Sequence, residues 1–327
     1  MSAPVPVISV VVPTYQRPDL LERCLAALLK QTLARDAYEI IVCDDGPSRA
    51  AQDLAEAANQ RTEGRPQVRY FPVTRTQGPA GARNVGWQAA RAELIAFTDD
   101  DTVPEPAWLE AGVQAMASGV EAAAGRIVMP LPERATDYER DAARLGEAEF
   151  ATANVFVRRS ALASVGGFDE RYTQAWREDS DLHFSLLERG YTIVPAPGAV
   201  VIHPLRSARF AASISSQKKV MYDVLLYRNH PRLYRERIRR TPPWFYTVVT
   251  ATLLAGVCSV LAGWQSLGFA SLLVWAVLTL FFFFRRLRLS AFTLRNVGEL
   301  LVSSLVIPPL SLFWRVVGAR RFGLAFP

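Results

Sequence analysis

Near its start the chain reads VISVVVPTY, from Val7 to Tyr15. Branched apolar residues as far as Val12 predict a buried strand, and the proline that follows begins a turn. Leucines then recur on one helical face between Leu20 and Leu29, which predicts a helix. The pattern repeats, with strands predicted at Tyr38–Cys43, Val68–Pro72 and Glu93–Thr98 and helices at Ala50–Gln60 and Ala80–Ala90. Strands that alternate with helices predict an α/β fold with a mostly parallel sheet and helices on both faces.

The composition excludes several classes of protein. Of the 327 residues, 50% are hydrophobic and 21% are charged, which is too apolar for a disordered chain. The three cysteines, Cys24, Cys43 and Cys258, are too scattered to hold a disulfide framework or a structural zinc ion. We therefore expect the α/β part to face a reducing cytoplasm.

Charge is divided unevenly along the chain. Residues 1–204 hold 20 basic and 28 acidic side chains, whereas residues 205–327 hold 17 and 3, so the net charges are −8 and +14. The basic residues flank the most apolar stretch, which is typical of a segment lying on an anionic cytoplasmic leaflet. This arrangement argues against a nucleic-acid partner.

A long uncharged run predicts a membrane hairpin. None of the 44 residues from Thr241 to Phe284 is charged. Because a bilayer core of about 30 Å needs about 20 residues of helix, we expect two spans, about 243–262 and 267–284, with a tight turn near Gly263–Gly268. Arginines precede the first span and follow the second, so both ends of the hairpin should be cytoplasmic. A helical hairpin buried in a soluble core is the alternative.

A third apolar segment, about 297–317, contains Pro308, Pro309 and Arg315. A full crossing would carry the arginines at its end outside, so we expect an interfacial or re-entrant segment, with a third span as the alternative. Met1–Pro6 has no charged start and a short apolar run follows it, so no signal peptide is predicted. The expected parts are an α/β domain at 1–210, a basic juxtamembrane helical segment at 211–240 and a membrane region at 241–327.

Polar turns follow the predicted strands, where ligands bind in parallel sheets. The turn after the first strand offers a hydroxyl, an aromatic ring and a guanidinium, and its residues are Pro13, Thr14, Tyr15 and Arg17. The turn after the second strand begins with Asp44 and Asp45. Either turn could instead cap the helix that follows it, and the aspartates could form an Asx turn.

The fourth strand ends in three consecutive carboxylates, Asp99, Asp100 and Asp101. Like charges so close repel one another unless a cation compensates them, and oxygen ligands suit Mg²⁺ or Mn²⁺. A solvated acidic turn is the alternative. His203 follows an apolar run and precedes a proline, so it could end a strand as a third metal ligand, or it could be a hydrogen-bonded histidine without a metal.

Two more motifs carry candidate functional groups. Glu178 and Asp179 open a predicted helix, where the peptide dipoles favour ionised carboxylates, so each is either a candidate general base or a helix-capping residue. Arg83 follows the glycine-containing stretch that begins at Gly78, and it could hold a guanidinium near the sheet's edge for a base or a diphosphate.

Taken in order, these motifs resemble the family 2 glycosyltransferases, which have the GT-A fold with a Rossmann-like, mostly parallel sheet. The resemblance covers roughly Val7–Pro204 and depends on Val10–Tyr15, Cys43–Gly46, Ala82–Asn84, Thr98–Asp101, Val165–Glu170 and Glu178–Leu182. It implies that residues 1–210 form a catalytic domain that uses a nucleoside-diphosphate sugar.

The resemblance also implies roles for individual residues. The donor-binding positions would be Pro13, Thr14, Tyr15, Arg17, Asp44, Asp45, Gly78, Arg83, Asp99 and Asp100, with Thr14, Tyr15 and Asp44 on the nucleobase and ribose. Asp99 and Asp101 stand as the family's Asp-x-Asp motif for Mn²⁺ or Mg²⁺, with His203 as the third candidate ligand. The extra carboxylate leaves open whether Asp99 or Asp100 pairs with Asp101. Asp179 would be the base of an inverting transfer, with Glu178 beside it.

Departures from the family pattern restrict the expected type of transfer and class of acceptor. The Gln-x-x-Arg-Trp stretch of the processive synthases is absent between Leu205 and Pro243, so a single hexosyl transfer is expected. We expect a UDP-, GDP- or dTDP-sugar donor and a lipid or lipid-linked glycan acceptor of the cell envelope. The site would face the cytoplasm at the inner membrane. A soluble or protein acceptor, and a non-catalytic nucleotide-sugar-binding subunit of a membrane complex, are the alternatives.

Overall fold

A computed structural model describes residues 5–205 and 210–324 of the chain. The chain divides into two compact units, Met1–Pro130 with Arg144–Pro204, and Leu131–Ala143 with Leu205–Pro327. Residues 131–143, which the sequence assigns to the α/β domain, thus group with the C-terminal part. The predicted boundary at residue 210 adjoins residues 206–209, which lie outside the described residues. Residues 1–4, part of the stretch in which no signal peptide is predicted, also lie outside them.

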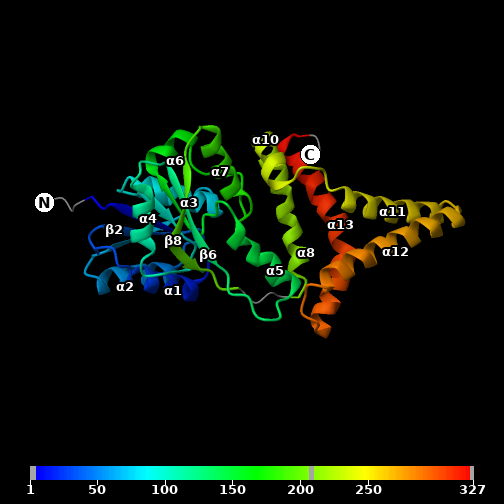
Figure 1. The fold of residues 1–327 in the computed structure, drawn as a ribbon, viewed down its shortest axis with the longest axis horizontal. Helices are drawn as coiled ribbons and strands as arrows, with labels where there is room; N and C mark the ends of the chain where they lie inside the picture. The colour runs from blue at the N-terminus through cyan, green and yellow to red at the C-terminus, as the bar shows by residue number, and fades with distance from the viewer. Residues whose placement is uncertain (1–4, 206–209, 325–327) are drawn as a thin grey trace. The chain divides into compact units, whose positions relative to one another are not determined.

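The first unit contains one mixed sheet of eight strands (Figure 1). Its order is β3-β2-β1-β4-β7-β6-β8-β5. The first four in this order are parallel, β7 is antiparallel to both neighbours, and β8 is parallel to β6 and antiparallel to β5. The bounds are β1 Ile8–Thr14, β2 Tyr38–Asp44, β3 Gln67–Pro72, β4 Leu94–Phe97, β5 Val103–Pro104, β6 Ala122–Val128, β7 Val155–Arg158 and β8 Ile193–Ile202.

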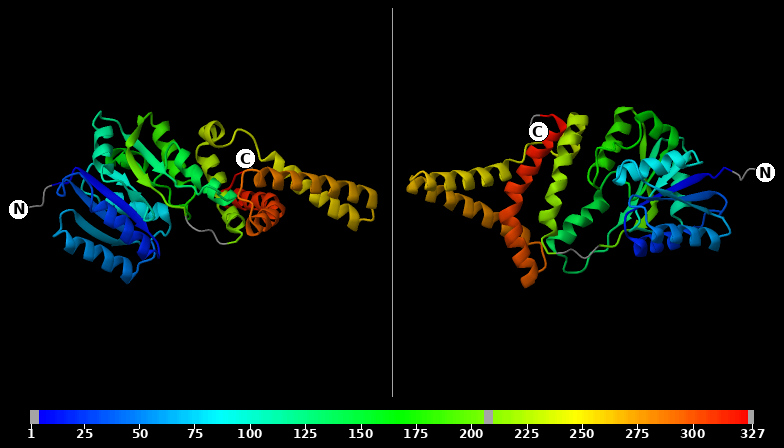
Figure 2. Two further views of the ribbon diagram at one scale, coloured as in Figure 1. Left: turned by 60° about the horizontal axis from the view of Figure 1, so that its bottom comes forward. Right: turned by 180° about the vertical axis from the view of Figure 1, so that it is seen from behind.

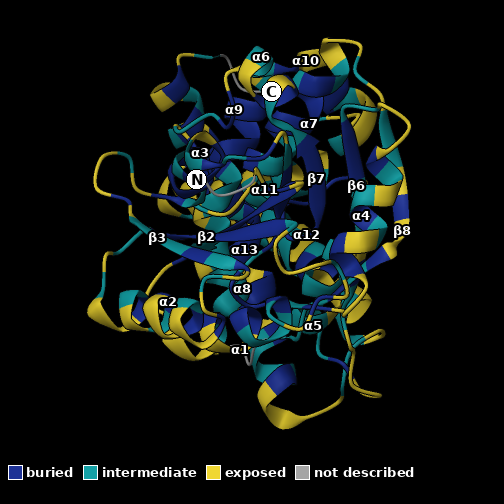
Figure 3. Cartoon of the chain, turned by 90° about the vertical axis from the view of Figure 1, so that its left-hand side faces the viewer, coloured by how far each residue is buried: buried dark blue, intermediate teal, exposed yellow. Residues whose placement is uncertain are grey.

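Helices cover both faces of this sheet, as the alternating pattern predicts. On β1, Ile8, Val10 and Val12 pack against α1, α2 and α4, whereas Val11 belongs to the core on the other face, with α3, α6 and α7. The buried strands lie between the exposed outer helix surfaces (Figure 3). The helices are α1 Pro18–Leu28, α2 Arg49–Arg61, α3 Pro79–Ala89, α4 Trp108–Met116, η1 Arg144–Glu147, α6 Arg159–Val165 and α7 Glu178–Glu188.

The second unit is helical. A long pair, α11 Trp244–Leu261 and α12 Gln265–Leu287, forms a hairpin, and α13 Leu294–Phe322 crosses its base (Figure 2). The shorter helices are α5 Asp137–Ala143, α8 Ala212–Ser215, η2 Ser216–Val220, α9 Met221–Asn229, α10 Pro231–Leu233 and η3 Tyr234–Ile238. An ion pair between Arg286 and Asp137 (2.7 Å) and a hydrogen bond from the Ala291 N–H to the Ala135 carbonyl (3.0 Å) explain why residues 131–143 group with this unit.

Three helices of the second unit, α11, α12 and α13, are long and apolar enough to cross a membrane. The predicted hairpin is present, with its turn at Ala262–Trp264. The third apolar segment is a continuous helix that includes both Pro308 and Pro309. Large apolar side chains on the hairpin are exposed, among them Leu254, Leu261, Leu273, Val277 and Phe281, which favours lipid contact over a soluble core.

Candidate active site

The turns after β1 and β4 are joined by a buried carboxylate. The Thr14 hydroxyl donates to Asp100 Oδ2 at 2.8 Å, and Arg17 Nη1 lies 3.5 Å from Asp100 Oδ1. Burial, together with the charges of Asp101 and Asp99, raises the pKa of Asp100 to about 6, although Thr14 and Arg17 oppose the shift. Asp100 therefore lies on the side of the acidic turn that faces β1.

The carboxylate of Asp44 organises the turn after β2. It is fully buried and accepts hydrogen bonds from the Gly46 and Ser48 N–H groups (3.1 and 2.8 Å) and from the Ser48 and Tyr70 hydroxyls (3.1 and 3.0 Å). Ser48 in turn caps α2. The hydrogen bond from the Gly46 N–H, two residues after Asp44, is that of an Asx turn, which was one of the alternatives for this motif. The half-exposed ring of Tyr15 lies against Gly46, where a Cβ would be 2.7 Å from Tyr15 Cε2.

Asp45 links the same turn to the start of α3. Its Oδ1 accepts the Gly78 N–H at 2.7 Å, and its own N–H donates to the Thr14 carbonyl at 2.9 Å. Burial raises the pKa of Asp45, as does the charge of Asp44, while the Gly78 N–H opposes the shift. The predicted donor-binding turns are therefore brought together along one edge of the sheet. Pro13 lies within β1 itself.

Arg83 connects two acidic motifs that are far apart in the sequence. Its buried guanidinium donates from Nη2 to Asp99 Oδ1 (2.7 Å) and from Nη1 to Glu178 Oε1 (3.1 Å). Burial alone would lower the pKa of Arg83, but the charges of Asp99 and Glu178 outweigh it and raise the pKa. The turn after β4 and the start of α7 are thus held beside each other by one charged side chain.

The two carboxylates at the start of α7 have different surroundings. Glu178 is buried, and its Oε2 also accepts the Trp176 N–H at 2.7 Å, so both of its oxygens have partners. Asp179 is partly buried and accepts at Oδ1 from the Ser180 N–H (2.6 Å) and hydroxyl (3.4 Å), which among the described residues leaves Oδ2 for another donor. Burial and the Asp179 charge raise the pKa of Glu178 to about 7, and burial also raises the pKa of Asp179.

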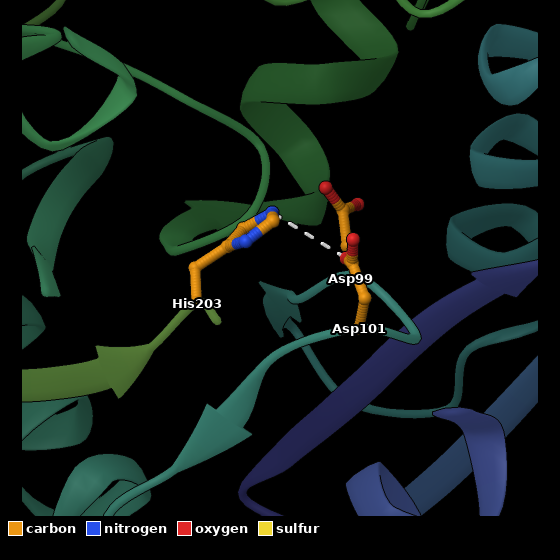
Figure 4. Close-up of side chains that lie close together, drawn as sticks. All are labelled: Asp99, Asp101 and His203. Carbon is orange, nitrogen blue, oxygen red and sulfur yellow. Dashed lines mark ion pairs between the residues drawn. The ribbon is translucent and has the colours of Figure 1, made fainter. Parts of the chain in front are cut away.

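Asp99, Asp101 and His203 form a group that could hold a metal ion, with one ligand atom from each lying within 4.8 Å of the others. His203 follows β8, and its Nε2 lies 3.4 Å from Asp101 Oδ1 (Figure 4). Its Nδ1 is buried and has no hydrogen-bond partner among the described residues. Two carboxylates and an imidazole at this spacing are a donor set that could hold a divalent cation. The group contains Asp99 rather than Asp100.

Sequence reasoning gave no role to Asn84, which lies beside Arg83. Its Nδ2 donates to the Phe168 carbonyl and Glu170 Oε1 (both 2.9 Å), and its Oδ1 accepts the Phe168 N–H at 2.9 Å. Asn84 thereby attaches the loop after α6 to α3. The signal was present, because Ala82–Asn84 and Val165–Glu170 are both motifs of the resemblance, but their contact could not be predicted from their separation of more than 80 residues.

The comparisons with known proteins agree with this geometry. Glycosyl transferase family 2 matches residues 9–168, and glycosyl transferase family group 2 matches residues 94–288, which is more than half of the chain. The chain belongs to the family 2 glycosyltransferases.

Relatives agree with this family, and a solved structure agrees with the fold. Glycosyltransferase AglE of Haloferax volcanii is 27% identical over 63% of this chain and 69% of its own length. Validoxylamine A glucosyltransferase of Streptomyces hygroscopicus subsp. jinggangensis is 27% identical over 77% of this chain and 66% of its own length. Mannosyltransferase PcManGT from Pyrobaculum calidifontis, solved with GDP-Man and Mn²⁺, aligns with a TM-score of 0.56 at 20% identity, over 94% of this chain and 87% of that one. This likeness confirms the predicted GT-A-like fold.

Proposed function

We propose that this glycosyltransferase moves a hexosyl group from a nucleoside-diphosphate sugar to a membrane-associated acceptor, with inversion at the anomeric carbon. The observation that carries the proposal is the contact of Arg83 with both Asp99 and Glu178. This contact supports the proposal because it holds Asp99, a candidate metal ligand, beside the start of α7, which carries Glu178 and the candidate base Asp179. A displacement reaction requires such groups to lie close together.

The chain's own groups have separate tasks in this reaction. Thr14, Tyr15 and Asp44 would receive the nucleobase and ribose, and Asp45 lies on the same turn as Asp44. Asp99, Asp101 and His203 would hold the divalent cation. When bound, the cation would neutralise the charge that develops on the leaving diphosphate, an effect of several kcal/mol in such sites. Arg83 keeps Asp99 in place through Nη2.

Asp179 would accept the proton of the acceptor hydroxyl. The hydroxyl oxygen forms a bond to the anomeric carbon as the bond from that carbon to the diphosphate oxygen breaks, and the proton passes to Asp179 Oδ2. Asp179 suits this role better than Glu178, because both oxygens of Glu178 already have partners in the protein. A positioned base of this kind contributes about 10²- to 10⁴-fold in rate.

The class of acceptor is inferred from the apolar helices of the second unit. Apolar helices that could cross a membrane follow the catalytic part of the chain, and arginines flank the hairpin, so the proposed acceptor is a lipid or lipid-linked glycan at the cytoplasmic leaflet. The name of AglE states no acceptor, and the name of the other relative states validoxylamine A, so the membrane-associated acceptor is inferred from these helices alone.

The test is release of nucleoside diphosphate from a panel of UDP-, GDP- and dTDP-sugars by the purified whole chain. Each donor is assayed with and without Mn²⁺ or Mg²⁺ and with and without extracted membrane lipid. We expect release from one donor that needs both the metal and the lipid. Release with a soluble acceptor in place of lipid would contradict the membrane-associated acceptor but keep the chemistry.

The metal site is tested with a pair of matched variants. Asp101→Asn should weaken Mn²⁺ binding, measured by electron paramagnetic resonance, and should abolish release. Asp53→Asn removes an exposed carboxylate on α2 that pairs only with Arg49 among the described residues, and it should change neither. Unchanged Mn²⁺ binding in Asp101→Asn would overturn the ligand assignment.

A further inference from the structure

Helix α13 carries polar residues among apolar ones on its buried side, and large apolar residues on its exposed side between its ends. The buried residues recur every three or four positions and include Asn296, Ser303, Ser304, Ser311 and Arg315. The large exposed hydrophobic residues are Leu294, Leu301, Val302, Leu305, Phe313 and Val316, while the exposed arginines lie only near the two ends of the helix, at Arg295, Arg320 and Arg321. A helix on the surface of a water-soluble protein has the opposite arrangement. The exposed side therefore fits a covering of lipid acyl chains.

Arg286, in the last turn of α12, contacts α13 far from the loop that joins the two helices. Its Nη1 donates to the hydroxyls of Ser303 and Ser304 at 2.8 and 3.2 Å. Because α13 begins at Leu294, these serines lie about 15 Å along it. A helix that returned into the membrane alongside α12 would bring its first turn, and not its third, next to Arg286. The contact therefore shows that α13 crosses α12 at the base of the hairpin, as Figures 1 and 2 also show.

Charged side chains meet the polar side of α13 well beyond this crossing. Lys218 Nζ lies 5.9 Å from the centre of the Trp314 ring, Arg315 pairs with Asp223 at 2.9 Å, and Arg228 donates to the Phe322 carbonyl. The row of charged contacts from Ser303 to Phe322 covers about 28 Å of helix. If α13 spanned a bilayer core of about 30 Å, much of this row would lie at hydrocarbon depth.

Two further features agree with a helix that does not span. The uncharged part of α13, residues 300–314, is about 22 Å long, which is shorter than the hydrocarbon core. The C-terminal part of α13 packs closely on α9, since a Cβ at Gly318 would lie 2.6 Å from the Met221 carbonyl oxygen. That helix carries Asp223 and Arg228, so α13 is packed on a charged element rather than on another apolar span.

We infer that α13 lies in the plane of the leaflet at the base of the hairpin, with its exposed apolar side on the acyl chains and its polar side on α9. Both ends of α13 are then on the same side of the membrane as the residues that precede α11. The partner of the exposed side is the lipid leaflet itself. This inference concerns topology, so its test does not depend on the reaction proposed above.

Cysteine accessibility distinguishes the two arrangements. Starting from Cys258→Ser, single cysteines are introduced as Arg240→Cys before α11, Gln265→Cys at the hairpin turn, and Arg320→Cys in the last turn of α13, all at exposed positions. Sealed membrane vesicles are treated with a membrane-impermeant maleimide before and after permeabilisation. Burial raises the pKa of the Cys24 and Cys43 thiols, so these two stay unreactive.

We expect Arg320→Cys to be labelled from the same side as Arg240→Cys, and Gln265→Cys from the opposite side. Labelling of Arg320→Cys together with Gln265→Cys would overturn the inference.

A depth measurement separates an in-plane helix from a re-entrant one. Spin labels are placed at Leu301, Leu305, Phe313 and Val316 in the same background, and their contact with oxygen and with a water-soluble nickel complex is compared. An in-plane helix gives nearly equal depths at all four positions. A spanning helix gives a steady change of about 22 Å from Leu301 to Val316, and a re-entrant helix gives the greatest depth at the middle positions. Either of these two patterns would contradict the inference.

Discussion

The first unit has a cluster of carboxylates, whereas in the second unit the guanidinium groups of arginines form ion pairs between segments that are distant in the sequence. In the turn after β4, Asp99, Asp100 and Asp101 are consecutive, and the Arg83 guanidinium compensates part of their negative charge. In the second unit, Arg286 and Arg315 pair with single aspartates that come from distant parts of the chain. An excess of carboxylates leaves negative charge that a cation can neutralise, whereas in a one-to-one ion pair each charge is already neutralised by its partner. The comparison predicts that charge changes in the first unit alter catalysis, and that those in the second alter stability.

The largest effect should come from Asp179. Asp179→Asn removes the proton acceptor and should lower the transfer rate by about 10²- to 10⁴-fold, while the donor binds as before. Transfer is measured by release of nucleoside diphosphate, and donor binding by calorimetry. A variant that turned over at close to the wild-type rate would show that another group takes the proton.

Removal of the Arg83 guanidinium should affect stability as well as rate. Arg83→Met leaves the buried Glu178 and the partly buried Asp99 without their shared partner, and breaking a buried ion pair costs about 3–5 kcal/mol. The thermal unfolding midpoint of the detergent-purified protein measures the loss. Arg49→Met is the control, because it breaks an exposed pair with Asp53 and should hardly move the midpoint. Equal midpoints for the two variants would disprove the role given to Arg83.

The rate should fall as the pH is lowered, with an inflection above the usual range of an aspartate. A general base must be ionised, and burial raises the pKa of Asp179, the proposed base, so Asp179 becomes protonated at a higher pH than a free aspartate does. Well below the inflection, the rate should drop about tenfold for each pH unit. The pH profile of the rate at saturating donor and metal tests this sign. A rate that stayed constant down to pH 5 would contradict it.

In the second unit the effect should be smaller and confined to stability. Arg286→Gln loses the ion pair with Asp137 and the contacts with Ser303 and Ser304, at a cost of about 1 kcal/mol. Arg288→Gln, two residues further at an exposed position, is the matched control and should be neutral. If Arg286→Gln reduced turnover of a soluble acceptor without changing the unfolding midpoint, the contrast between the two units would fail.

Much of the first unit could be predicted because its signals are local. The strand predicted at Val7–Val12 is β1, Ile8–Thr14, and the one predicted at Tyr38–Cys43 is β2, Tyr38–Asp44, since runs of branched apolar residues mark buried strands directly. The polar turns after these strands lie at one edge because parallel strands share their direction. His203 was predicted to lie at the end of a strand because it follows an apolar run, and it does follow β8, which ends at Ile202.

Contacts between distant segments could not be predicted. Arg83 meets Glu178 across 95 positions, and this depends on how α3 lies on the sheet, which no local pattern specifies. Asp137 meets Arg286 across 149 positions, so nothing in its own neighbourhood assigns α5 to the second unit. Pro308 and Pro309 suggest a break, yet α13 continues through them, because packing along its buried side outweighs the lost backbone hydrogen bonds.

The shared contact of Arg83 also has a thermodynamic consequence. Since one guanidinium donates to both Asp99 and Glu178, the interaction energy of either carboxylate depends on whether the other is present. In a double-mutant cycle the two positions form a single coupled unit, although they belong to motifs 79 residues apart in the sequence. Under the function proposed above, metal binding at Asp99 and the ionisation of the carboxylates at the start of α7 would therefore be coupled.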